Sequence, residues 1–246
     1  AQLEPALVDG ALLLVESLAT YSGFQVTEAI YGQGHVRRHI RELRSNIQTR
    51  STRAGVPLLQ NNEAVDAYSK GPISLYGISH YIGTERVHSA LRNLLEMYGS
   101  GEPPLPTSLE FYEELRAVTP DSLNYLLHDF FEANTYWELT TEHVEATQSE
   151  TGVWDVLLHV HARKMVVDSV GVETVVPVGD WVQVGVFADP GEDRDPGDQV
   201  YGLEEPIYVQ YHRIQSGKQT ISVQVPRKPI QAGIDPYRLL MDLDAR

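Results

Sequence analysis

The chain has 246 residues, of which 42% are hydrophobic and 22% charged, and it is long enough to bury the core of an ordinary globular protein. It contains 19 Lys and Arg against 34 Asp and Glu, and the net charge of −15 disfavours binding to nucleic-acid phosphates. Because the sequence has no cysteine, it excludes a disulfide framework, a thiolate zinc site and a cysteine nucleophile.

The sequence carries no sign of a membrane span or of a leader. Its best apolar run, Ala11–Val15, is far shorter than the roughly 18 residues of a transmembrane helix. It begins with Ala rather than Met, and no charged segment followed by an apolar stretch and a cleavage site marks a signal peptide. We interpret the chain as a soluble piece of a longer protein.

Apolar residues follow a helical period over about the first 135 residues. Thr107 and Glu110 form a capping-box pattern that predicts a helix starting at this point. Thr119 followed by Pro120 indicates the N-cap and first turn of the next helix. One apolar stripe that follows a Gly-Thr start signal predicts a further helix and consists of Val87, Leu91, Leu94, Leu95 and Tyr98.

The period changes to two in the second part of the chain. Apolar and polar residues alternate along residues 154–162 and 181–187, which predicts half-buried strands. Two similar runs, 207–211 and 221–225, flank a Ser-Gly-Lys turn and predict a β-hairpin.

These patterns predict an α+β fold in which the chain changes once from helices to strands. Residues 1–135 form the helical part and residues 136–246 an antiparallel β-sandwich, because several short alternating strands are typical of that architecture. The expected core of the sandwich includes Trp137, Trp154 and Trp181.

Glu16 is a single carboxylate in an otherwise apolar helical stretch. Its neighbours at helical spacing include Leu12, Leu13 and Ala19, none of which offers it a partner. A buried carboxylate without a partner costs several kcal/mol, roughly, so Glu16 requires an arginine, a network of donors or a metal ion. Spacing alone leaves both a structural ion pair and a metal ligand open.

Tyr68 lies three residues before Gly71 and ahead of another helical stretch. A tyrosine beside a glycine that permits close backbone approach could donate its hydroxyl to a substrate oxyanion. A packed aromatic side chain is the alternative, and the residues alone do not separate the two.

Histidine pairs at two positions invite a metal interpretation, which we reject. His35 and His39 have the spacing of a helical zinc site, but Val36 stands where the catalytic glutamate would be and arginines surround the pair. These arginines, six between residues 37 and 53, are expected to form a solvated face rather than a nucleic-acid surface. His159 and His161 share one strand face but lack a third ligand.

Several segments, in chain order, resemble the aminopeptidase N family of zinc metallopeptidases, which are gluzincins. They are residues 9–23, Tyr68-Ser69-Lys70-Gly71 and Ile82-Gly83-Thr84-Glu85. The resemblance is closest to bacterial members whose peptidase part ends a chain with an ABC-transporter-like permease. Those members carry segments similar to Leu105-Pro106-Thr107-Ser108, Thr119-Pro120-Asp121-Ser122 and Ala232-Gly233-Ile234-Asp235-Pro236.

The resemblance implies roles for individual residues. Glu16 would be the third zinc ligand, the other two being the histidines of an HExxH helix whose glutamate is the general base. Tyr68 would be the catalytic donor to the tetrahedral intermediate, with Lys70 and Gly71 positioning it. HExxH does not occur in this sequence, and by the resemblance the chain begins just downstream of it. Pro72 stands where the family usually has alanine.

The resemblance also implies a function for the parent protein. It would be a zinc-dependent aminopeptidase acting on peptides, with residues 1–135 as the C-terminal half of a thermolysin-like catalytic domain. With one ligand, this chain alone is expected to bind no stoichiometric zinc and to be inactive. We expect the parent to be membrane-associated, on either side of the membrane, through the permease segment.

Two further expectations concern partners. Without the upstream half of the catalytic domain, we expect a large apolar patch or self-association near residues 6–24. The alternative to an enzyme is a non-catalytic helical plus β-sandwich interaction module of a pseudo-peptidase. A sandwich that binds carbohydrate or peptide is a weaker third interpretation, suggested by Tyr201, Tyr208 and Tyr211.

Overall fold

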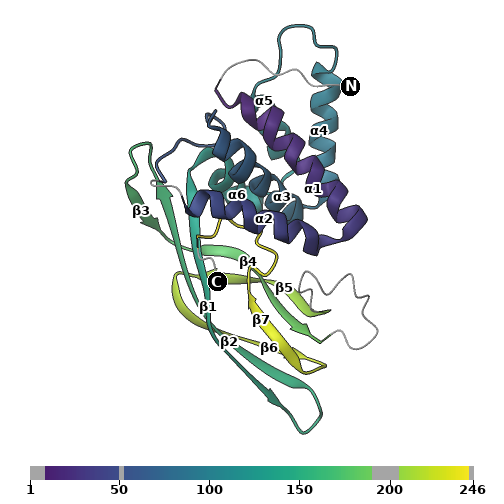
Figure 1. The fold of residues 1–246 in the computed structure, drawn as a ribbon, viewed down its shortest axis with the longest axis vertical. Helices are drawn as coiled ribbons and strands as arrows, with labels where there is room; N and C mark the ends of the chain where they lie inside the picture. Colours follow the sequence, from purple (N-terminus) through teal and green to yellow (C-terminus); the bar gives the residue numbers. More distant parts are fainter. Residues whose placement is uncertain (1–8, 50–52, 190–204, 244–246) are drawn as a thin grey trace.

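The structure is a computed structural model that describes residues 9–49, 53–189 and 205–243. Helices gather at one end of the molecule and strands at the other, and α2 runs along the boundary between them (Figure 1). In the described residues the helical elements are η1 (Leu13–Ser17), α1 (Leu18–Tyr31), α2 (Gln33–Gln48), η2 (Asp66–Lys70), α3 (Gly71–Ile82), α4 (Thr84–Tyr98), α5 (Ser108–Val118), η3 (Asp121–Leu123), α6 (Asn124–Leu127) and η4 (His128–Glu132). Of these, η1, η2 and η4 are π-helical and η3 is a 3-10 turn.

The strands form two antiparallel sheets. In the described part of the chain they are β1 (Thr135–Gln148), β2 (Trp154–Val167), β3 (Glu173–Val176), β4 (Gly179–Ala188), β5 (Glu205–Gln215), β6 (Gly217–Val225) and β7 (Pro229–Ile234). One sheet has β2 at its centre, paired with β1, β3 and β6, and the other has the order β5-β4-β7. Buried side chains of both sheets and of the helices belong to one core cluster.

The α+β class is therefore correct, and the change from helix to strand occurs between Glu132 and Thr135. Whether the chain divides there into two separate domains stays a prediction. The capping box is confirmed, since Thr107 and Glu110 satisfy each other's backbone groups at the start of α5. Thr119, by contrast, ends α5, because its hydroxyl donates to the Leu115 carbonyl rather than capping the next helix.

The predicted hairpin is wrong. β5 and β6 follow each other in sequence, but β5 pairs with β4 and β6 pairs with β2, so the chain crosses from one sheet to the other at Ser216. Gly217 makes this crossing with a φ of 85°, a backbone conformation that favours glycine. The Ser216-Gly217-Lys218 sequence does mark a change of chain direction, but a turn alone does not specify which strands pair.

The tryptophans differ in burial. Trp137 is fully buried and Trp154 half-buried, while Trp181 is exposed and is not a core residue. The indole Nε1 of Trp137 donates a hydrogen bond of 2.8 Å to Asp180 Oδ2. This bond links the helix-proximal end of β1 to β4.

A buried charge network joins the helical part to both sheets. Lys164 of β2 donates from Nζ to Asp129 of η4 at 3.0 Å and to Asp180 of β4 at 3.0 Å. All three side chains are buried. Burial raises the pKa of Asp129, an effect that the ammonium of Lys164 partly offsets. Lys164 of β2 thus pairs with one carboxylate from η4 and one from β4.

Within residues 9–49, 53–189 and 205–243, no helix has both the length and the apolar character needed to cross a membrane.

We expect Lys164→Met to lower the free energy of unfolding by about 3–5 kcal/mol, because two buried carboxylates would lose their cation. Lys218→Met is the matched control, since Lys218 pairs with Glu142 at 2.7 Å at the surface and its loss should cost less than about 1 kcal/mol. Urea unfolding followed by tryptophan fluorescence measures both. Equal losses in the two variants would contradict a structural role for the buried network.

Candidate functional site

The π-helices η1 and η2 lie in direct contact although about 50 residues separate them. Ser17 at the end of η1 donates from Oγ to the Ala67 carbonyl in η2 at 2.7 Å. A Cβ atom on Gly71, which follows η2, would lie 2.1 Å from Ser17 Oγ and 2.7 Å from Ser17 Cβ. Ser17, the small residue that meets Gly71, has no recognisable signal in the sequence.

This contact brings Glu16 and Tyr68 together. Glu16 lies beside Ser17 in η1, and Tyr68 follows Ala67 in η2. The Glu16 carboxylate lies close enough to the phenol to raise the pKa of Tyr68, and burial acts in the same direction. Since π-helical turns are rare and are often found at functional sites, two facing each other mark this place as a candidate site.

The surroundings of Glu16 differ from those expected. The side chain is half-buried rather than enclosed in an apolar core, because η1 turns Leu13, Leu14 and Ser17 inward. Its partner is a phenol, and Tyr68 is 47% exposed. The carboxylate therefore remains accessible, and its burial does not require an arginine, a network of donors or a metal ion.

Lys70 anchors η2 from the opposite side. Its side chain is buried, donates to Asn134 Oδ1 at 2.6 Å and places Nζ 4.6 Å from the ring centroid of Tyr136. Asn134 in turn donates to the carbonyls of Arg53 and Val167. Lys70 thus ties the Tyr68 segment to the sheet and has no direct role at the phenol. Asn134 had no recognisable signal in the sequence.

The start of η2 is fixed in a similar way. Asn61 donates from Nδ2 to Asp66 Oδ2 at 2.6 Å, and its Oδ1 accepts the Glu63 backbone N–H at 2.6 Å. Both Asn61 and Asp66 are buried. Hydrogen bonds at its two ends and the contact with Ser17 in its middle leave little freedom for the backbone that carries Tyr68.

The described residues do not make a complete metal site. No group of three or more His, Asp or Glu side chains in them could hold a metal ion. A catalytic zinc needs about three protein ligands, so the described residues could hold zinc only together with ligands from elsewhere. His143 and His159 stack at the surface near Glu145, at 5.9 Å between ring centroids, without a third histidine.

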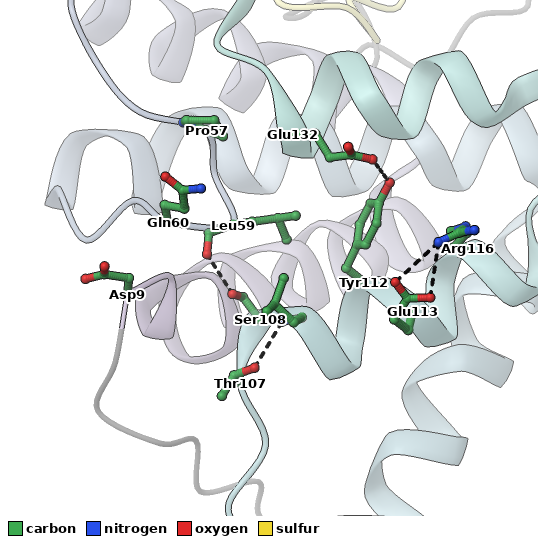
Figure 2. Close-up of a pocket in the computed structure, with 11 residues that line it drawn as sticks. Asp9, Pro57, Leu59, Gln60, Thr107, Ser108, Tyr112, Glu113, Arg116 and Glu132 are labelled. Atoms are coloured by element: carbon green, nitrogen blue, oxygen red, sulfur yellow. Dashed lines mark hydrogen bonds and ion pairs between the residues drawn. The ribbon is translucent and has the colours of Figure 1, made fainter.

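A cavity of about 620 Å³ opens beside the start of η1 (Figure 2). Its lining includes Leu59, Tyr112 and Glu132, with the Tyr112 hydroxyl donating to the Glu132 carboxylate. Burial, and then Glu132, raises the pKa of Tyr112. Neither Glu16 nor Tyr68 lines this cavity.

An apolar stripe is exposed along η1 and α1. It continues the predicted patch at residues 6–24, of which residues 6–8 lie outside the described residues. Its spacing of four, seven and four residues keeps it on one helix face, and it consists of Val15, Ala19, Val26 and Ile30. Tyr68 is exposed near its Glu16 end, so the stripe adjoins the candidate site.

The tyrosines proposed for ligand binding do not form an exposed platform. Tyr208 and Tyr211 are half-buried, and Tyr211 donates to the His80 carbonyl and stacks near Tyr81. Tyr201 lies outside the described residues. The two described tyrosines are therefore engaged within the chain.

Gly71→Ala should destabilise the chain by about 1–3 kcal/mol, because the added methyl group meets Ser17. Gly23→Ala is the control, since nothing lies within 4 Å of its Cβ position in α1 and alanine should stabilise the helix by roughly 0.5–1 kcal/mol. Thermal unfolding distinguishes the two. Similar stabilisation of both variants would show that η1 and η2 are not closely packed.

Glu16→Gln should lower the pKa of Tyr68 towards its ordinary value of 10, because a neutral amide no longer disfavours the phenolate. Tyr68 of the unaltered chain therefore ionises at a higher pH than in the variant. NMR titration of ring-labelled tyrosine, assigned with Tyr68→Phe, measures the shift, and the exposed Glu96→Gln is the control. An unchanged Tyr68 pKa in Glu16→Gln would show that the two side chains do not interact.

Comparison with known protein families and with curated proteins finds no match: no family model fits the chain, and no curated protein is significantly similar to it.

Proposed function

We propose that this chain is part of a zinc-dependent metallopeptidase, an aminopeptidase acting on peptides, in which Glu16 is a zinc ligand and Tyr68 a catalytic residue. The single observation that carries the proposal is the pairing of these two side chains by η1 and η2. The resemblance to the aminopeptidase N family selected them separately, from segments about 50 residues apart. Their proximity was not used to choose them, so it is independent support.

Tyr68 has the properties that an oxyanion donor requires. The pKa of Tyr68 lies above its ordinary value of 10, so the phenol is protonated at neutral pH and can donate a hydrogen bond. Its exposure leaves the hydroxyl accessible to a substrate, and Lys70 and Ser17 restrain the backbone on either side. A donor held in place in advance contributes more than a mobile one, because its orientation costs nothing during the reaction.

Glu16 would share the metal with two histidines supplied by a segment outside these residues. The bound zinc would polarise the peptide carbonyl and a water molecule. The exposed stripe of α1 and η1 fits the surface against which the missing half of a thermolysin-like catalytic domain would pack. The strands would then form a β-sandwich next to this domain, and the parent chain would also contain a membrane permease segment.

The residues encoded immediately upstream of Ala1 test the proposal first, because they must include HExxH. In the complete protein, Tyr68→Phe should reduce kcat for an aminoacyl-anilide about 10²–10³-fold with the zinc content unchanged. Glu16→Ala should lower the zinc content, and the exposed Tyr31→Phe should change neither. The 246-residue chain alone should hold less than stoichiometric zinc.

Other outcomes would overturn this assignment. Full activity of the Tyr68→Phe protein would remove Tyr68 from catalysis, and stoichiometric zinc in Glu16→Ala would remove Glu16 from the ligands. Absence of HExxH upstream would favour the non-catalytic interaction module, whose partner would cover the same stripe of α1.

A further inference from the structure

A second cavity, of about 550 Å³, lies on the boundary between α2 and the two sheets. Its walls come from α2, from β1, β4 and β6, and from β7 with the turn that follows it. Its charged lining residues are Arg37, Arg44, Glu142, Lys218, Asp235, Arg238 and Asp242. A cationic cavity is unexpected in a chain with a net charge of −15.

The three carboxylates of this cavity already have partners. Glu142 pairs with Lys218 at the rim at 2.7 Å. Asp235 accepts Arg44 at 3.0 Å and also the backbone N–H groups of Leu239 and Leu240. These carboxylates are thus occupied by structural bonds.

Asp242 is occupied as well. It accepts the Leu139 backbone N–H at 3.0 Å and lies 3.9 Å from Arg44. Arg238, in contrast, keeps donors to spare.

Arg238 leaves donor capacity at the cavity, and Arg44 adds a buried positive charge to its wall. Arg44 is 2% exposed, and its Nε is buried without an acceptor although Nη2 donates to Asp235 and to the Leu240 carbonyl. Arg238 is half-buried, and in the described part of the chain no carboxylate forms an ion pair with it. The expectation of a fully solvated arginine face is therefore wrong at Arg44.

Backbone geometry holds Arg238 at the cavity. Asp235 and Arg238 have φ angles of 46° and 60°, in the region that non-glycine residues rarely occupy. The Arg238 N–H donates to the Asp235 carbonyl at 3.0 Å and closes a tight turn. Arg44 holds this turn in place, because its guanidinium pairs with the Asp235 side chain.

We propose that this cavity binds a doubly charged oxyanion, the phosphate or polycarboxylate group of a small molecule, through Arg238 with the charges of Arg37 and Arg44. A guanidinium matches two oxygens of such a group at once, which a lysine ammonium cannot do. The site is separate from Glu16 and Tyr68 and does not depend on the proposed peptidase function.

The electrostatics of Arg238 support this assignment. Burial, together with the guanidinium groups of Arg44 and Arg37, lowers the pKa of Arg238 to about 10. Asp235 opposes this effect, while Arg41, one turn along α2 from Arg37, adds to it. The charged form of Arg238 is thus poorly compensated, and a bound anion would supply the missing charge.

Isothermal titration of the 246-residue chain with inorganic phosphate, and separately with citrate, at constant ionic strength tests the proposal. At least one of the two anions should bind, and the arm that responds identifies the preferred group. Arg238→Gln should weaken that binding at least roughly tenfold. Glutamine and arginine have a similar energetic cost at the positive φ of this position. Arg92→Gln, on the exposed face of α4, should leave it unchanged.

Arg37→Gln is a second variant in case Arg238→Gln fails to fold, which circular dichroism would reveal. It removes one cavity charge from the surface of α2 and should also weaken binding. Absence of binding by both anions, or binding that neither cavity variant affects, would overturn the proposal.

Discussion

The close approach of Ser17 to Gly71 is the constraint on which the candidate site depends. Only hydrogen fits at position 71, since a Cβ would lie 2.1 Å from Ser17 Oγ. The small Ser17 side chain also donates a hydrogen bond to the Ala67 carbonyl, so the two π-helices are bonded as well as closely packed. Each helix then carries one of the two candidate side chains, Glu16 or Tyr68, in the residue next to this contact. Any displacement of η2 from η1 would therefore separate the phenol from the carboxylate.

Three buried cations hold the elements around this contact against the sheets. Lys70 reaches Asn134 from η2, Lys164 of β2 reaches η4 and β4, and Arg44 reaches the turn after β7 from α2. A buried cation fixes how two elements are oriented, because moving them apart would leave its buried partner without a compensating charge or hydrogen bond. The position of Tyr68 is thus set by the helix–sheet boundary as much as by its own helix.

Local patterns in the sequence predicted local structure well and long-range pairing poorly. The α5 capping box and the alternation in β2 each depend on residues a few positions apart, and both are present. The hairpin failed because a turn signal cannot name the partner strand, and β6 bonds to β2 instead. The burial of Glu16 was overestimated because a helical period of 3.6 does not describe a π-helical turn. No spacing could reveal that Ser17 meets Gly71.

α2 connects the two sites physically, since it packs against η2 and also lines the cationic cavity. Binding at one site would affect the other only if the ligand had different affinities for two arrangements of α2. Arg44 is fixed by Asp235 and by the Leu240 carbonyl, so moving α2 would break bonds to a buried guanidinium. An anion at Arg238 adds contacts to the same turn and same helix. Its effect should therefore be to strengthen the existing arrangement of α2 and η2, rather than to switch it.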